Sequence, residues 1–170
     1  MVAALMMHPL PYHDTKPVGA ADFYFAINAT FRFIREKLGS DALSAYWQDL
    51  GREYMAPVSH LWKVGGLPAV AEYWRAFFDA EPGAKVTVTM EKDRVLLDIQ
   101  TCPAIRHLRA GGRTIDPGFC QHCYCVSEAA AEKAGFAVRV KGGNGQCQQT
   151  FSPRDQAFGP QIMENIEKAL

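Results

Sequence analysis

The spacing of apolar side chains predicts helices through the first half of the chain. Phe23, Ile27 and Phe31 recur with the helical period, and charged residues lie mainly between them. Gly39 then ends the run. Pro68 begins another predicted helix, because proline is tolerated in a first helical turn. The elements expected in this half are an irregular arm over residues 1–19 and helices over residues 20–38, 42–55 and 68–80.

In the second half the period changes to two, which is typical of half-buried strands. Val86, Val88 and Met90 alternate with polar residues, and a similar alternation resumes at Val95 after a charged turn. The elements expected in this half are strands over residues 85–90 and from residue 95, a short helix or loop over 104–112, a helix over 120–134, strands from 136 and over 146–151, and a terminal helix over 160–170.

Together these patterns predict an α+β fold, in which a helical N-terminal half is followed by a β-β-α-β-β segment. The two hairpins are expected to form one antiparallel sheet covered by helices, in a single domain over residues 20–170. By strand parity, Cys147, Gln149 and Phe151 share one face. The same rule places Cys102 on the opposite face of its own strand, beside Asp98, if that strand extends so far.

Charge and hydropathy narrow the classes of function. The chain has 18 Lys and Arg against 18 Asp and Glu, with no basic stripe, so a nucleic-acid binder is not expected. No apolar run approaches the roughly 18 residues that span a bilayer, and the N-terminus is a poor signal peptide. We therefore expect a soluble, cytoplasmic protein. Its zero net charge does little to oppose self-association into a homo-oligomer.

The candidate chemistry is concentrated between residues 102 and 147. This window contains all five cysteines, whereas the preceding hundred residues contain none. In a reducing compartment, an odd number of clustered cysteines favours metal ligands, catalytic thiols or core residues over disulfides. The five are Cys102, Cys120, Cys123, Cys125 and Cys147.

The first hypothesis is a metal site. Cys120 and Cys123 form a C-x-x-C pair on one face of a predicted first helical turn, where partial positive charge favours thiolates. Four thiolates, or three with a histidine, suit tetrahedral zinc or an iron–sulfur cluster. The expected ligands are Cys102, Cys120, Cys123 and Cys147, with His107 or His122 as a substitute.

The second hypothesis is nucleophilic catalysis. A cysteine at a helix N-terminus with a histidine nearby is a common way to activate a thiolate. Cys120, Cys123 and Cys125 are candidates for the nucleophile, and His122 or His107 for the base.

The third hypothesis is that the thiols are ordinary core groups, since free cysteine is among the most buried residue types. The glycine-rich segment at residues 142–145 joins two predicted strands with no helix after it. It therefore indicates a hairpin turn and not a phosphate loop.

Several of these segments resemble the bacterial L-2-amino-thiazoline-4-carboxylic acid hydrolase family. They are Cys102-Pro103, the Cys120 region, the run from Ala129 to Phe136, and Gly145-Gln146-Cys147 with Phe151. The closing strand also resembles the small-molecule-binding domains named after four-vinyl reductase. The resemblance covers roughly residues 85–152. It implies site residues at Cys102, Cys120 or Cys123, and Cys147. It also implies hydrolysis of a C–N bond that opens a thiazoline ring, whereas the extra cysteines of this chain make a metal or sensor role the alternative.

Overall fold

The computed structural model describes residues 21–157 and 159–170, so the predicted arm lies outside the described residues. The N-terminal half of the described chain is helical, as its apolar periodicity predicts. A non-helical Gly66, with φ of 66°, kinks the long third helix just before Pro68, where the sequence predicts a new helix. The elements of this half are α1 (Ala21–Leu38), α2 (Ser40–Asp49), the π-helical turn η1 (Leu50–Tyr54) and α3 (Ala56–Asp79).

The second half alternates strands and helices. Two hairpins flank a pair of helices, and Gly135 ends the longer helix in the left-handed conformation with φ of 85°. The elements are β1 (Lys85–Met90), β2 (Val95–Thr101), α4 (Pro103–Ala110), α5 (Phe119–Ala134), β3 (Phe136–Gly143), β4 (Gln146–Pro153), the 3-10 turns η2 (Arg154–Gln156) and η3 (Met163–Asn165), and β5 (Ile166–Glu167).

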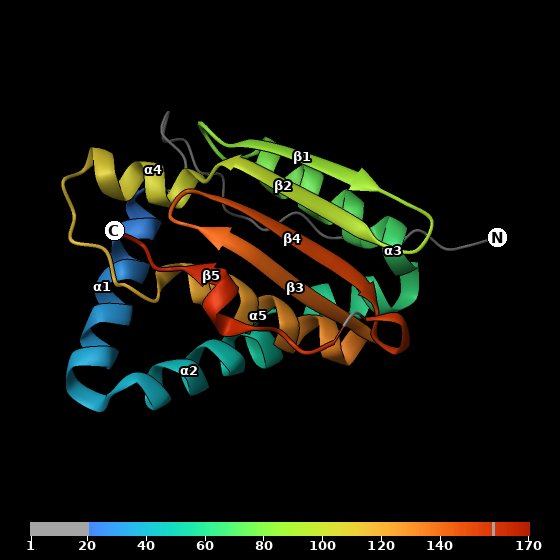
Figure 1. Cartoon of the computed structure of the whole chain (residues 1–170), viewed down its shortest axis with the longest axis horizontal. Coiled ribbons are helices and arrows are strands. Elements are labelled where there is room, and N and C mark those ends of the chain that lie inside the picture. Colours follow the sequence, from blue (N-terminus) through green and yellow to red (C-terminus); the bar gives the residue numbers. More distant parts are fainter. Residues whose placement is uncertain (1–20, 158) are drawn as a thin grey trace, which may run out of the picture.

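The strands form one five-stranded sheet in the order β1-β2-β4-β3-β5 (Figure 1). The two hairpins and the central β2–β4 pair are antiparallel, as predicted. The short strand β5 adds a parallel pairing with β3 at Gly142 and Gly143, so the complete sheet is mixed. The prediction of a terminal helix over residues 160–170 is therefore wrong. Sheet pairing and a 3-10 turn replace it, because this segment packs along the edge of β3.

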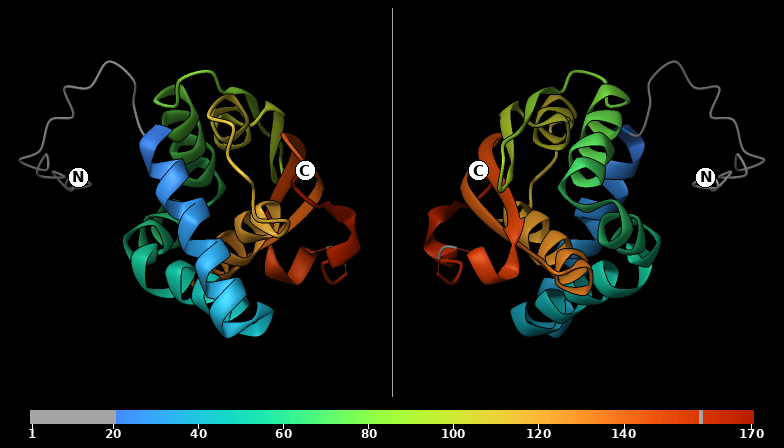
Figure 2. Two further views of the ribbon diagram at one scale, coloured as in Figure 1. Left: turned by 90° about the vertical axis from the view of Figure 1, so that its left-hand side faces the viewer. Right: turned by 90° about the vertical axis from the view of Figure 1, so that its right-hand side faces the viewer.

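The helices all lie on one side of the sheet, as the two side views show (Figure 2). One apolar cluster lies between the inner face of the sheet and helices α3 and α5, around Trp62, Leu97 and Phe151. A second cluster lies among α1, α2, α4 and the start of α5, around Phe31, Trp47 and Leu108. The protein is therefore an α+β fold with its core on the helical side of the sheet.

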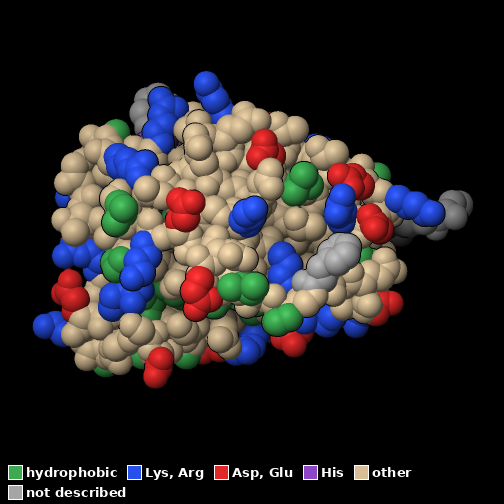
Figure 3. Space-filling model, viewed as in Figure 1, with side chains coloured by type: hydrophobic (Ala, Val, Ile, Leu, Met, Phe, Trp, Pro, Cys, Tyr) green, Lys and Arg blue, Asp and Glu red, His purple; other side chains and the backbone are tan. Residues whose placement is uncertain are grey.

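The other face of the sheet is open and polar. Figure 3 shows mainly uncharged polar and backbone surface there, with scattered charges of both signs. Gln100 and Gln148 both donate side-chain hydrogen bonds to Asp98, at 3.2 and 3.3 Å. No helix among the described residues is long and apolar enough to span a bilayer.

Cys102 is expected on this open face only if its strand extends so far, and that condition is not met. Strand β2 ends at Thr101, and Cys102 instead forms the N-cap of α4, where it packs against both apolar clusters. Pro103 occupies the first position of α4. The change from strand to helix turns the Cys102 side chain toward the interior.

Candidate functional site

Four thiols lie close enough for their charges to interact, and two of them, Cys102 and Cys120, pack against both apolar clusters. Cys102 comes from the start of α4, Cys120 and Cys123 from the first turns of α5, and Cys147 from the inner face of β4. Each of the other three has a pKa raised in part by its proximity to Cys123. The same cysteine also contributes to the raised pKa of Cys125. Cys123 is thus the centre of the cluster.

Cys125 lies on a different side of α5 from the cluster centre. Two residues along a helix turn the side chain by about 200°. Accordingly, Cys125 packs with the cluster around Phe31 and Trp47 and not with the cluster around the sheet. It therefore serves as a matched control for the four gathered thiols.

The glycine-rich hairpin turn between β3 and β4 makes hydrogen bonds to two of the cysteines. The backbone N–H of Asn144 donates a hydrogen bond to Cys120 Sγ at 3.2 Å, and the Gly145 amide also lowers the pKa of that thiol. The carbonyl of Gly145 accepts the N–H of Cys102 at 2.9 Å. The turn therefore joins β3 and β4 to both α4 and α5 at the thiol cluster. The sequence could not show this contact, because Asn144 is 24 residues from Cys120 and farther still from Cys102.

Burial is the main influence on the acidity of these thiols. It raises the pKa of Cys102 and Cys123 to about 11 and that of Cys120 to about 12, and it raises the pKa of Cys147 as well. The amides of Ile105 and Ala104, together with the charge of Arg109, act in the opposite direction on Cys102 without overcoming burial. At neutral pH the thiols are therefore protonated.

His122 lies beside Cys123 and packs against the rings of Phe31 and Phe119, with centroids 5.1 and 4.8 Å away. Its Nδ1 contacts the carbonyl oxygen of Phe119, which can only accept, so Nδ1 carries the proton and Nε2 is free to accept one. Cys123 Sγ is 3.8 Å from Nε2 and 3.9 Å from Nδ1, so it lies beside the ring and not in line with one nitrogen. Burial lowers the pKa of His122, which keeps the ring neutral.

His107, the other predicted base, lies away from this pair. Its ring stacks on Tyr24 at 6.1 Å, and its Nε2 donates to the Pro82 carbonyl oxygen at 3.3 Å. Among the contacts of the described residues, none joins His107 to a thiol. The structure therefore brings His122 to Cys123 and places His107 beside a tyrosine.

Tyr24, which the sequence did not single out, adjoins the cluster, and Glu81 is its hydrogen-bond partner. Tyr24, on the buried face of α1, has its pKa raised by burial, by hydrogen bonding with Glu81, and by the charges of Glu81, Cys102 and Cys123. The helical period could have indicated Tyr24, because the buried stripe of α1 runs through it and Asn28 while Phe23 is 58% exposed. No local pattern marks Glu81, which lies in the turn after α3.

A buried amide approaches the cluster from the sheet. Gln149, only 5% exposed, hydrogen-bonds to Cys147 and thereby lowers the pKa of that thiol against the larger effect of burial. Its Oε1 has no partner among the described residues, and neither has Glu81 Oε2. Native proteins satisfy most buried polar atoms, so these two acceptors are candidates to bind a hydrogen-bond donor.

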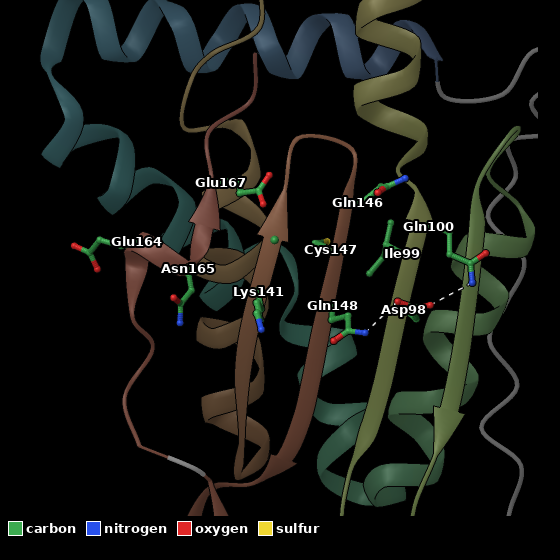
Figure 4. A pocket seen from close by; sticks show the side chains of 11 residues that line it. Asp98, Ile99, Gln100, Lys141, Gln146, Cys147, Gln148, Glu164, Asn165 and Glu167 are labelled. Atoms are coloured by element: carbon green, nitrogen blue, oxygen red, sulfur yellow. Dashed lines mark hydrogen bonds between the residues drawn. The ribbon is translucent and has the colours of Figure 1, made fainter.

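Two surface pockets border the thiol cluster, one at Cys102 and one at Cys147. One, of about 530 Å³, is lined by Cys102, Arg106, Arg109 and the hairpin turn. The other, of about 540 Å³, is lined by Cys147 and by polar residues of β2, β3 and β4 (Figure 4). Gln100, Gln146 and Glu167 line both pockets, so the two openings adjoin.

The thiols fit a soft metal in their chemistry but not in their arrangement. Thiolate sulfur suits zinc or an iron–sulfur cluster. However, over residues 21–157 and 159–170 no group of three His, Cys, Asp or Glu side chains is placed to hold an ion. The predicted ligands Cys102, Cys120, Cys123 and Cys147 lie within electrostatic reach of one another but are not arranged around an ion, and zinc or a cluster remains a prediction.

Comparisons with family models, with curated proteins and with solved structures found no match to this chain. The resemblance to the thiazoline-carboxylate hydrolases therefore stays a prediction based on the residues that carry it.

Proposed function

We propose that the protein is a hydrolase-like protein that opens a small thiazoline-type ring at an interior site centred on Cys123. The observation that carries this proposal is the central position of Cys123 among the thiols. Its neighbour His122 has an unprotonated Nε2 that can accept the thiol proton. The family resemblance supplies the class of substrate.

In the proposed reaction, Cys123 transfers its proton to His122 Nε2, and its sulfur bonds to the carbon of the ring C=N group. The ring nitrogen takes the electron pair of the C=N double bond together with the proton that His122 returns. The remaining C–N single bond then breaks as the 2-amino group forms a C=N bond to the same carbon, and one of its protons passes to the departing nitrogen. Water adds to that carbon and displaces the Cys123 sulfur, which takes a proton from the water and becomes the thiol again. Because burial raises the pKa of Cys123 to about 11, the resting thiol is protonated and gives up its proton to His122 as it attacks.

The test is turnover of L-2-amino-thiazoline-4-carboxylate, followed by mass spectrometry of the opened product. We expect Cys123→Ser to reduce kcat at least about 100-fold, because an alcohol is a much poorer nucleophile at neutral pH. Cys125→Ser is the matched control and should retain activity. An inactive native protein, or an active Cys123→Ser variant, would reject the proposal.

A second candidate function is binding of a metal or cluster for sensing. It is favoured by the backbone N–H of Asn144 that points at Cys120 Sγ, because such donors stabilise metal-bound thiolates. Metal and sulfide content per chain, with the visible spectrum of anaerobically purified protein, tests it. Loss of bound metal in Cys102→Ser but not in Cys125→Ser would support it. A metal-free native protein after growth with zinc and iron would reject it.

A further inference from the structure

The turn that carries Glu81 is held in place by α4. Arg106 Nη1 donates to the Gly83 carbonyl oxygen at 3.2 Å, and His107 Nε2 donates to that of Pro82 at 3.3 Å. Cys102 begins the same helix. The position of Glu81 is therefore fixed relative to the thiol cluster, although the two are 21 residues apart in the chain.

The Glu81 carboxylate makes a hydrogen bond with Tyr24, whereas its Oε2 atom has no partner among the described residues. Tyr24, 9% exposed, hydrogen-bonds with Glu81, and its ring is held by stacking on His107. Glu81 Oε2 is buried and has no partner among the described residues. A buried acceptor without a donor is costly, by about 1–3 kcal/mol and more for a charged group. Such an atom indicates a missing donor.

The donor that fits best is a cationic N–H group. Tyr24 hydrogen-bonds with Glu81 and belongs to the apolar cluster against which Cys102 and Cys120 pack, so the carboxylate lies near the thiol site. The other free acceptor near the thiols is an amide oxygen, Gln149 Oε1. A group with two or more N–H donors would satisfy a carboxylate by charge-assisted hydrogen bonds.

We propose that Glu81 binds a cationic N–H group of the ligand, of the amidinium or guanidinium type, at the thiol site, and that Tyr24 is the residue that positions it. The inference rests on the proposed function only in that a small molecule occupies this site. Glu81 is a binding residue for that molecule whether or not a ring is opened.

The test uses acetamidinium as the probe, with acetamide as its neutral counterpart of similar shape. Labelling of Cys102 and Cys123 by iodoacetamide is followed by peptide mass spectrometry at constant pH and ionic strength. We expect acetamidinium, and not acetamide, to slow labelling of both thiols. Glu81→Gln should weaken this protection about tenfold in Kd, because it removes the charge and keeps the shape. Glu72→Gln, an exposed change on α3, should leave it unchanged.

Tyr24→Phe is the second variant, because it keeps the ring that stacks on His107 and removes only the hydroxyl. It should weaken protection less than Glu81→Gln does. Equal protection in the native protein and Glu81→Gln, or protection by acetamide as strong as by acetamidinium, would overturn the proposal. So would the absence of any protection, which would mean that water satisfies Glu81. Because labelling needs no turnover, protection without ring opening would reject the hydrolase alone.

Discussion

Burial has a larger effect on the reactivity of the thiols than any neighbouring charge. For Cys102, the favourable amides of α4 and Arg109 oppose burial, yet its pKa rises to about 11. For Cys120, two backbone amides of the hairpin turn lower the pKa, but burial outweighs them and the pKa still rises to about 12. A helix N-terminus is therefore not sufficient to activate a cysteine when its sulfur is removed from water.

The thiol pKa raised by burial predicts how the rate of thiol labelling depends on pH. With a pKa of about 11, the thiolate fraction of Cys123 rises about tenfold per pH unit from pH 7 to pH 10, and the labelling rate should rise with it. Iodoacetamide labelling followed peptide by peptide measures this rate. The urea-unfolded protein is the control, and its thiols should level off near pH 9. A plateau for native Cys123 below pH 9 would show an activated thiolate and contradict the prediction.

Among the elements, the π-helical turn η1 fits tightly against α5. Met55 N–H bonds to the Leu50 carbonyl oxygen five residues earlier, at 3.1 Å. A Cβ on the buried Gly51 of this turn would lie 2.4 Å from the Val126 carbonyl oxygen and 2.6 Å from Ala129 Cβ. Glycine at this position therefore lets the helical layer approach the helix that carries Cys120 and Cys123.

We predict that Gly51→Ala lowers the free energy of unfolding by about 1–3 kcal/mol, because overpacking outweighs the better helix propensity of alanine. Urea denaturation followed by tryptophan fluorescence measures this change. Glu53→Ala, an exposed substitution in the same turn, is the control and should change stability by less than about 0.5 kcal/mol. Equal stability of Gly51→Ala and the native protein would show that the helices can separate without cost.

At the scale of the whole molecule, a buried ion pair joins the helical half to the start of α5. Arg35 of α1 makes two hydrogen bonds to Asp116, at 2.7 and 2.9 Å. Asp116 is fully buried, and its Oδ1 also accepts the N–H of Gly118, the N-cap of α5, at 2.8 Å. This pair therefore sets where the first turn of α5, with its two thiols, lies against α1.

We predict that Asp116→Asn lowers the free energy of unfolding by about 3 kcal/mol, because it leaves the half-buried Arg35 without its counter-charge. Glu36→Gln, which breaks the exposed Arg32–Glu36 pair, is the control and should cost less than about 1 kcal/mol. Thermal and urea unfolding measure both variants. A similar small loss in the two would mean that the buried pair does not hold α1 to α5.

What the sequence by itself determined is local. The three- and four-residue spacing of apolar side chains predicted the helices, and the two-residue spacing predicted the hairpins, since each depends only on neighbours along the chain. The shared inward face of Cys147, Gln149 and Phe151 also follows from parity and is confirmed. The α+β class follows from the order of these elements.

The tertiary structure alone decided which distant residues meet. It turned Cys102 inward, brought four thiols close to one another, paired the tail with β3, and placed Tyr24, the partner of Glu81, beside the cluster. None of these contacts produces a periodic pattern in the sequence. They join residues many positions apart, and whether those residues meet depends on how whole elements pack. The candidate site was therefore predictable in its residue types and not in its geometry.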